Sequence, residues 1–228
     1  MNRYAIGDIH GGCTTFRTLL DKLNLRQGDR IYLLGDYVDR GSDSKGVLDT
    51  ILHLMDFGYD VRPVRGNHDD MMLRSYSDDH DGQSKMWLKC WGEGTLRSFG
   101  VSRISDLPLR YLTLLDALPL LQIADDFVFV HGALDMYRDD PLTQSSRTDM
   151  LWGDLGMVDP SKIGGRKLVT GHNIRPLQLI TASLRSNRIN LDNGAFTTMQ
   201  PEMGNLVALN LDTMELTIQK WLDGVARE

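Results

Sequence analysis

Side chains that can bind metals recur at the ends of short apolar runs in this sequence. Four such runs end in glycine followed by a polar residue, within residues 7–10, 35–41, 66–69 and 171–172, and a fifth run, 127–130, leads into a His-Gly pair. Ligands of open α/β sheets bind outside the carboxyl ends of the strands. If these strands stop at a common sheet edge, their polar residues share one cleft and suffice for two metal ions. The candidate ligands are Asp8, His10, Asp36, Asn67, His131 and His172.

Each candidate ligand also has an ordinary structural interpretation. A Gly-Asp pair is usually a turn, and an internal histidine is more often a hydrogen-bonded core residue than a ligand. Independent turns, however, have no reason to place carboxylates, an amide and imidazoles after successive strands. Glycine beside each ligand also lets the backbone approach an ion closely, because it lacks a Cβ. The joint pattern therefore favours a metal site.

Hydrophobic spacing predicts the elements that would position these residues. Apolar residues at i, i+3, i+4 and i+7 predict helices over 16–23 and 48–55, and compact apolar runs predict strands over 31–34 and 61–64. This βαβαβ order is typical of an α/β fold with a mostly parallel sheet. The later part of the chain predicts strands at 127–130, 168–170 and 188–191, and a β-hairpin formed by 206–211 and 215–221.

The middle of the chain interrupts the β pattern. Residues 75–85 are polar and predict a loop, and helices are expected around 86–99 and 107–118. We expect residues 71–121 to form a mainly helical, cap-like insertion over the cleft. The length of 228 residues suits one large domain over residues 1–228, with a substantial core.

Composition excludes several classes of partner. The formal net charge is −6 and no Lys/Arg cluster is visible, which argues against a nucleic-acid binder. The apolar stretches are too short to cross a bilayer, so no membrane partner is expected. Residues 1–6 run directly into Gly7-Asp8 and leave no space for a secretory signal, which predicts a cytoplasmic protein. Cys13 and Cys90 form neither a disulfide framework nor a thiolate zinc site. The oligomeric state is not predicted.

Three segments of the chain resemble the signature blocks of a known family. Gly7-Asp8-Ile9-His10-Gly11, the run 35–41 (GDYVDRG) and Gly66-Asn67-His68-Asp69 are similar to those of the phosphoprotein phosphatase branch of the calcineurin-like metallophosphoesterases. His131 and Gly171-His172 fit the family order, and the compact length resembles the bacterial and bacteriophage serine/threonine phosphatases. The resemblance implies a calcineurin-like metallophosphoesterase fold, an α/β fold with a central β-sandwich flanked by helices and a dimetal site at the carboxyl ends of the strands.

The resemblance also implies a ligand set for two divalent ions, with the Asp36 carboxylate bridging them. Oxygen and imidazole ligands without thiolate suit manganese, iron or zinc, of which we favour manganese. The first ion would be held by Asp8, His10 and Asp36, and the second by Asp36, Asn67, His131 and His172.

Further roles follow from the same resemblance. Two ions roughly 3.5–4 Å apart would present a bridging hydroxide for direct attack on a phosphomonoester. His68 would act as general acid, held by Asp39. Arg40 would bind the substrate phosphate together with Asn67, because a guanidinium suits phosphate geometry; the alternative for Arg40 is a surface salt bridge.

These features predict a serine/threonine protein phosphatase acting on a phosphoprotein or phosphopeptide. The alternative is a dinucleoside polyphosphate hydrolase, of the diadenosine tetraphosphate type, on the same scaffold. A catalytically silent binding module is the third possibility, disfavoured by the complete ligand set. The intact Asp39-Arg40-Gly41 favours the monoesterase, since related dinucleotide hydrolases often vary at that aspartate.

One position departs from the family pattern. Compact bacterial members usually follow a Leu-Trp pair with an arginine that clamps phosphate, whereas Asp154 lies near that place here. We favour Arg175, three residues beyond His172, as the substitute, with Arg147 and Arg166 as alternatives.

Overall fold

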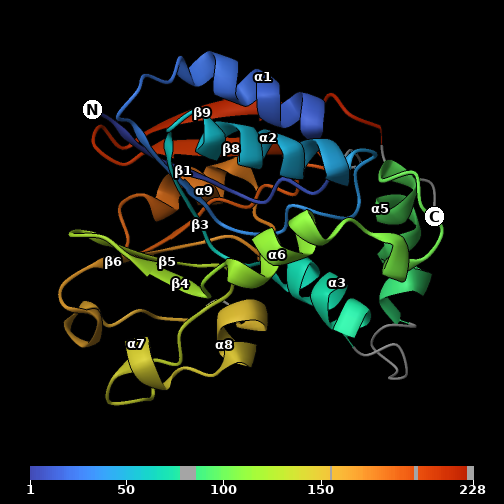
Figure 1. Cartoon of the computed structure of the whole chain (residues 1–228). Helices are drawn as coiled ribbons and strands as arrows, with labels where there is room; N and C mark the ends of the chain where they lie inside the picture. The colour runs from blue at the N-terminus through green and yellow to red at the C-terminus, as the bar shows by residue number, and fades with distance from the viewer. Residues whose placement is uncertain (78–85, 155, 198–199, 225–228) are drawn as a thin grey trace.

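Two β-sheets face each other in the computed structural model, which describes residues 1–77, 86–154, 156–197 and 200–224. The five-stranded sheet has the order β3-β2-β1-β8-β9, with β1, β2 and β3 parallel and β8 and β9 antiparallel. The expected sandwich flanked by helices is confirmed (Figure 1). The strands of this sheet are β1 (Arg3–Ile6), β2 (Arg30–Leu33), β3 (Asp60–Pro63), β8 (Asn205–Asn210) and β9 (Glu215–Lys220).

The four-stranded sheet has the order β4-β5-β6-β7. Strands β5, β6 and β7 are parallel, and β4 pairs antiparallel with β5. The predicted strands at 127–130, 168–170 and 188–191 are all present, whereas β4 was not predicted. The bounds are β4 (Leu121–Ile123), β5 (Phe127–Val130), β6 (Lys167–Thr170) and β7 (Arg188–Asn190).

Alternation of side chains along the strands builds the layers. Ala5 of β1 packs between the two sheets, whereas its neighbour Ile6 packs toward the helices. The rings of Tyr32 and Phe129, from β2 and β5, stack with centroids 3.9 Å apart and join the two sheets. Val128, next to Phe129, points to the opposite face and packs in a separate cluster. Strands covered on both faces explain why their sequences read as continuous apolar runs.

Helices cover both outer faces. The predicted helices are confirmed as α1 (Cys13–Leu23) and α2 (Ser44–Asp56), which lie above the five-stranded sheet in Figure 1. Helices α7 (Pro141–Gln144) and α8 (Arg147–Trp152) lie below the four-stranded sheet. Ser146 and Asp149 form a capping box that starts α8. Helix α9 (Leu177–Ser183) lies beside β7, and a 3-10 turn, η3, spans Pro160–Ile163.

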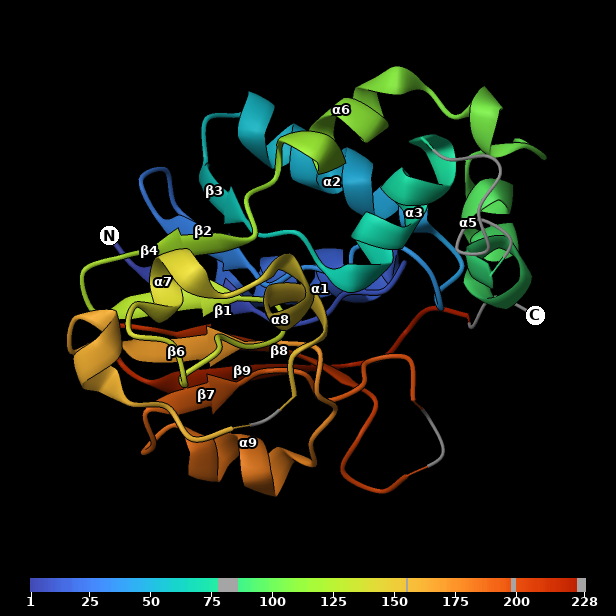
Figure 2. The same cartoon turned by 90° about the horizontal axis from the view of Figure 1, so that it is seen from below.

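The middle segment is mainly helical, as expected. It contains α3 (Asn67–Ser77), a π-helical turn η1 (Leu88–Gly92), α5 (Glu93–Ser98), a 3-10 turn η2 (Ile104–Asp106) and α6 (Leu109–Ala117). Residues 75–77 belong to α3 rather than to the predicted loop, and 78–85 lie outside the described residues. Figure 2 shows α3, α5 and α6 grouped on one side of the molecule. The one-domain organisation of 1–228 and the cap role of 71–121 stay predictions.

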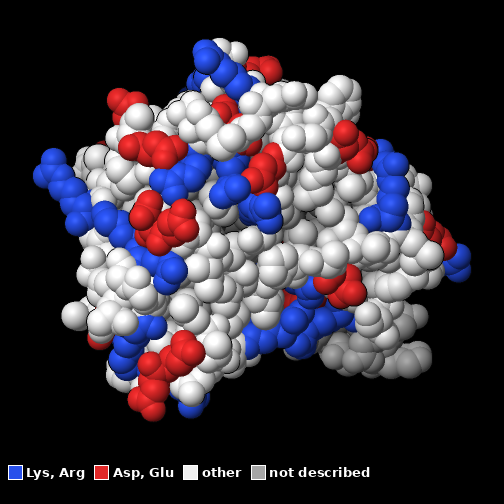
Figure 3. Space-filling model, turned by 60° about the vertical axis from the view of Figure 1, so that its left-hand side comes forward, with Lys and Arg blue, Asp and Glu red and all other residues white. Residues whose placement is uncertain are grey.

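The carboxyl ends of five strands meet at one end of the sandwich. Strands β1, β2 and β3 lead into residues 7–8, 35–36 and 66–67, and β5 and β6 lead into residues 131 and 171–172. The ligand strands therefore come from two facing sheets rather than from the common edge of one sheet. No helix among the described residues is long and apolar enough to cross a membrane. On the face shown in Figure 3, basic and acidic side chains are interspersed.

Candidate dimetal site

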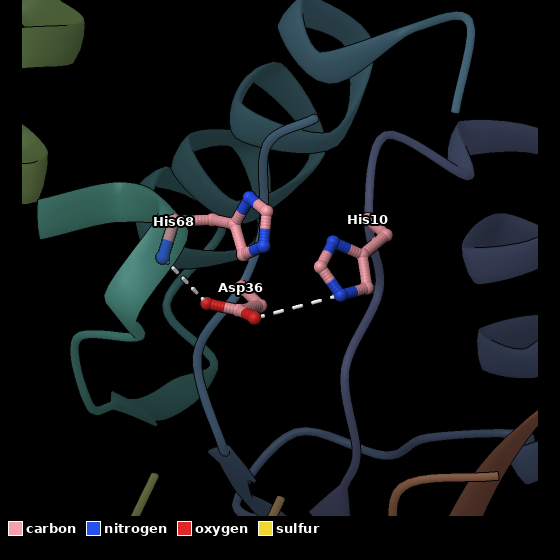
Figure 4. A group of neighbouring side chains, drawn as sticks. All are labelled: His10, Asp36 and His68. Atoms are coloured by element: carbon pink, nitrogen blue, oxygen red, sulfur yellow. Dashed lines mark hydrogen bonds and ion pairs between the residues drawn. The ribbon is translucent and has the colours of Figure 1, made fainter. Parts of the chain in front are cut away.

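Asp36 lies at the centre of the converging side chains. Its side chain is buried, and Nε2 of His10 lies 3.5 Å from Asp36 Oδ2, whereas Nε2 of His131 lies 3.4 Å from Oδ1 (Figure 4 shows the His10 side). The backbone N–H of His68 donates to Oδ1 at 2.9 Å and orients the carboxylate. A carboxylate that bridges two metal ions needs a further ligand near each of its oxygens. The imidazoles of His10 and His131 meet this requirement at Asp36.

Backbone carbonyls set the tautomers of two histidines. His10 Nδ1 lies 3.2 Å from the carbonyl oxygen of Val38, and His131 Nδ1 lies 2.7 Å from that of Leu34. A carbonyl only accepts, so each Nδ1 carries the proton and each Nε2 presents its lone pair toward Asp36. Burial lowers the pKa of His10 to about 3 and also lowers the pKa of His131. Both rings are therefore neutral, which is the form that binds metal.

Asn67 brings a second group of lone pairs together. Its Oδ1 lies 2.7 Å from Nε2 of His131 and 3.1 Å from Nδ1 of His172. With the His131 proton on Nδ1, the short contact between Oδ1 and Nε2 joins two acceptors. Two buried acceptors facing each other are unfavourable without a donor or a cation between them. The residues present therefore fit a metal ion.

Asp8 completes the cluster from the opposite side. The backbone N–H of His172 lies 3.2 and 3.0 Å from the two Asp8 oxygens. Burial, together with the carboxylates of Asp192 and Asp36, raises the pKa of Asp8 well above its usual value. This concentration of buried negative charge would be relieved by cations. Potential ligand atoms lie within 4.8 Å of one another in two groups that share Asp36: His10, Asp36 and His68, and Asp8, Asp36 and His131.

The backbone at the site is strained. His10, Asp36 and His172 have φ angles of 47°, 53° and 63°, in the left-handed region that residues other than glycine rarely adopt. Such residues cost about 1–3 kcal/mol each and persist where surrounding structure enforces them. Position 66 requires glycine, because a Cβ there would overlap the amide and carboxylate of Asp36. The strained backbone and the glycine therefore orient the side chains of the proposed ligands.

His68 and Asp39 form a buried pair beside the cluster. His68 Nδ1 lies 2.7 Å from Asp39 Oδ2, which leaves Nε2 for the site. Trp87 Nε1 donates to Asp39 Oδ2 at 2.9 Å, and the Thr95 hydroxyl donates to Oδ1 at 2.6 Å. Burial lowers the pKa of His68, but the carboxylates of Asp36 and Asp39 outweigh it, and the net shift is upward. His68 is thus arranged to carry a proton.

Arg40 is held between aromatic rings. Its guanidinium carbon lies 5.0 Å from the centroid of Trp91 and 5.1 Å from that of Phe196. Its Nε is buried and has no hydrogen-bond partner within the described residues. Among the described residues, Arg40 forms no salt bridge, whereas the alternative interpretation placed it in a surface salt bridge. Cation–π contacts orient the guanidinium without neutralising it, which suits a group that binds an anion.

Asp69 is a supporting residue to which the sequence pattern assigned no role. It is fully buried, and its carboxylate accepts backbone N–H groups of Asp36 at 2.9 Å, Tyr37 at 3.0 Å and Gly66 at 2.9 Å. The carboxylate thus joins the loops after β2 and β3, which carry Asp36 and Asn67. In the sequence, the feature that could have indicated a role for Asp69 was its position in the third signature block.

We expect Asp69→Ala to lower the free energy of unfolding by at least about 3 kcal/mol. Three buried N–H donors would lose their shared acceptor, and each such loss costs about 1–3 kcal/mol. Urea unfolding of the variant, with Asp139→Ala on an exposed loop as control, measures the effect. A change below about 1 kcal/mol would mean that other groups can satisfy these donors.

The three candidate arginines occupy different places. Arg166 donates to the carbonyls of Ala124 at 2.9 Å and Ile163 at 3.1 Å, near the amino end of β5 and thus away from the site. Arg147 pairs with Asp70 on α3. Arg175 is half-buried on the loop after His172, and its backbone N–H donates to the carbonyl of Asp192 at 2.9 Å. Arg175 as the second phosphate clamp stays a prediction.

Relatives of known name match this chain. The symmetrical bis(5'-nucleosyl)-tetraphosphatase of Pectobacterium carotovorum is 33% identical over 152 residues, which cover 63% of this chain and 47% of that protein. The protein of the same name from Hamiltonella defensa is 28% identical over 213 residues, covering 89% of this chain and 72% of the relative. The chain thus spans about half the length of the Pectobacterium relative.

Solved structures share the fold. A protein proposed to be a diadenosine tetraphosphatase has a TM-score of 0.67 at 19% identity, covering 98% of this chain and 93% of that one. A protein serine/threonine phosphatase from Saccharomyces cerevisiae has a TM-score of 0.65 at 16% identity, covering 98% and 81%. At these identities the likeness concerns the fold alone.

The family pattern described as calcineurin-like phosphoesterase matches residues 1–197. This match spans the five strand ends and every candidate ligand. The family uses a dimetal site, and the structure holds candidate ligand groups where such a site is expected. The chain belongs to the calcineurin-like phosphoesterase family.

Proposed function

We propose that this protein hydrolyses dinucleoside tetraphosphates symmetrically at a dimetal site. Water adds to one of the inner phosphorus atoms, the central P–O–P bridge breaks, and two nucleoside diphosphates leave. The observation that carries the hydrolase part is the convergence of buried acceptors around Asp36 beside the His68–Asp39 pair. The substrate class is supported by the names of the relatives from Pectobacterium and Hamiltonella.

The predicted serine/threonine protein phosphatase, with a phosphoprotein or phosphopeptide partner, is wrong. The matching curated relatives are named for a dinucleoside tetraphosphate substrate. The intact Asp39-Arg40-Gly41 does not discriminate between the two chemistries. Asp39 accepts hydrogen bonds from Trp87 and Thr95 and pairs with His68, which is a positioning task for either leaving group.

The chain's own residues have distinct tasks in this proposal. Asp8, His10, Asp36, Asn67, His131 and His172 would hold the two cations, for which manganese stays our prediction. When bound, such a metal pair supplies Lewis-acid stabilisation and an acidified water. His68 holds a proton at Nε2 for the leaving phosphate oxygen, and Asp39 fixes the ring. Arg40, oriented by Trp91 and Phe196, binds a non-bridging phosphate oxygen.

Purified protein stripped with a chelator and reloaded with Mn²⁺ tests this proposal. We expect hydrolysis of diadenosine tetraphosphate with ADP as the sole nucleotide product, and far slower hydrolysis of a phosphoserine peptide. Formation of AMP and ATP would contradict symmetrical cleavage. Preferential hydrolysis of the peptide would overturn the substrate class.

We expect Arg40→Ala to lower kcat/KM for diadenosine tetraphosphate by roughly 10- to 150-fold, since charge-assisted hydrogen bonds contribute about 1.5–3 kcal/mol. Arg40→Lys should recover part of the loss, because the point charge remains while the planar fork is lost. Steady-state kinetics beside the exposed control Arg103→Ala measure this. If Arg40→Ala showed wild-type kinetics, Arg40 would not bind the substrate phosphate.

A further inference from the structure

A recess opens directly beside the candidate dimetal site, between α3 and α8. Figures 1 and 2 show these helices side by side. The recess has a volume of about 300 Å³. Asp70, on its wall, lies one helical turn beyond Asn67 on α3. The ring centroid of Trp152, on the opposite wall, lies 5.9 Å from that of His172. Two residues that line the recess are thus neighbours of the proposed metal ligands Asn67 and His172.

Arginine side chains contribute to its polar side. The Asp70 carboxylate is almost fully buried and is surrounded by the guanidinium groups of Arg65, Arg74 and Arg147. Arg65 is buried, whereas the side chains of Arg74 and Arg147 are 50% and 41% exposed, and both line the recess. Arg147 contacts the carboxylate through Nε and one terminal nitrogen, and its half-exposed guanidinium has further N–H donors at the mouth of the recess. These donors can bind an anion.

Its other side is apolar and aromatic. Trp152 is 45% exposed and stands with Met71, Met86 and Leu151 around the recess. An exposed large aromatic surface beside a reaction centre is a feature that packing alone does not explain. Indole faces bind nucleobases by stacking, and this interaction tolerates any base. Methionine side chains adapt to such flat ligands.

We propose that this recess binds the nucleotide portion of the substrate that lies beyond the scissile bond, with the base against Trp152 and its phosphates at Arg147. The inference rests on the proposed function and names the residues that recognise the substrate. Cationic groups next to an aromatic wall match a phosphorylated nucleoside, which carries both an anion and a flat ring. A phosphopeptide offers the phosphate but needs no stacking surface.

Two ligands that differ by the nucleoside separate the two sides of the recess. Calorimetry on the Mn²⁺-loaded protein would compare ADP with inorganic pyrophosphate. We expect Trp152→Ala to weaken ADP binding by roughly 5- to 150-fold, the range for losing one stacked base. Pyrophosphate binding should weaken much less, so the ADP preference falls. Trp152→Phe should restore most of that preference, which a merely structural role would not produce.

The arginine side is tested in the same way. Arg147→Ala should weaken ADP and pyrophosphate binding to a similar extent, because both present phosphate oxygens. Arg103→Ala and Phe57→Ala, at exposed positions away from the recess, serve as matched controls. Thermal unfolding of each variant separates loss of binding from loss of fold.

Failure of this inference is distinguishable from failure of the proposed function. If the wild type cleaves diadenosine tetraphosphate into ADP but Trp152→Ala retains its KM and its ADP preference, the recess is not the nucleotide site. If the wild type does not cleave diadenosine tetraphosphate, the proposed function fails, and the ADP comparison still decides what the recess binds. A KM increase for a phosphopeptide but not for the dinucleotide would also overturn the inference.

Discussion

Asp36→Asn is expected to lose at least one of two bound metal ions and to lower kcat by roughly 10³-fold or more. The neutral amide removes the one carboxylate whose two oxygens face His10 at 3.5 Å and His131 at 3.4 Å. A metal ion contributes several kcal/mol of charge stabilisation in the transition state, and each 1.36 kcal/mol corresponds to tenfold in rate. Elemental analysis and steady-state kinetics on the same preparations measure both effects.

Asp106→Asn is the matched control for this substitution. Asp106 lies on an exposed turn, where it pairs with Arg103. The amide introduced by Asp36→Asn keeps one oxygen that can accept the His68 N–H, so the fold should survive, as thermal unfolding would verify. Retention of two ions with near-normal turnover in Asp36→Asn would show that Asp36 does not bridge them.

The strand ends of this fold could be predicted because their signals are local. Runs such as Phe127–Val130 are buried on both faces and therefore apolar throughout, and each is followed within a few residues by glycine and a polar residue. Glycine is required where the backbone passes close to a carboxylate, as Gly66 does beside Asp36. Both features are visible in a single sequence. The division of the strands between two sheets was not visible in this local pattern.

The supporting residues could not be predicted, because their contacts depend on the tertiary fold. Trp87 and Thr95 reach Asp39 from 48 and 56 residues away, and Phe196 meets Arg40 from the far end of the chain. Core packing is the ordinary expectation for a tryptophan in a sequence. It describes the buried ring of Trp87 but misses its hydrogen bond to Asp39, and it does not describe the exposed Trp152.

The substrate class was the least predictable property. A phosphate ester and a phosphate anhydride present the same tetrahedral phosphate to the ligands and to Arg40. They differ in the leaving group, whose oxygen either chemistry can protonate through His68, and in what lies beyond that oxygen. Residues that distinguish them belong to surfaces such as the recess at Trp152 and Arg147, where the one family pattern, the Leu-Trp pair, does not indicate a substrate.

His68→Asn is expected to keep both metal ions while turnover falls by about 10²- to 10⁴-fold, the usual contribution of a positioned acid or base. His68 Nδ1 is engaged by Asp39, so Nε2 is the atom from which a proton would pass to the leaving oxygen. A His68 ligand atom also lies within 4.8 Å of those of His10 and Asp36, so a metal-binding role is the competing interpretation. Metal content separates the two roles.

The leaving group provides the second and sharper measurement. A phosphate leaving group has a pKa of about 6 and needs less protonation than an aryl oxide of higher pKa. For a series of aryl phosphates, the rate of His68→Asn should therefore fall more steeply with leaving-group pKa than that of the wild type. Equal slopes, with both ions retained, would show that His68 supports the site without donating a proton. Loss of one ion would instead assign it to the metal centre.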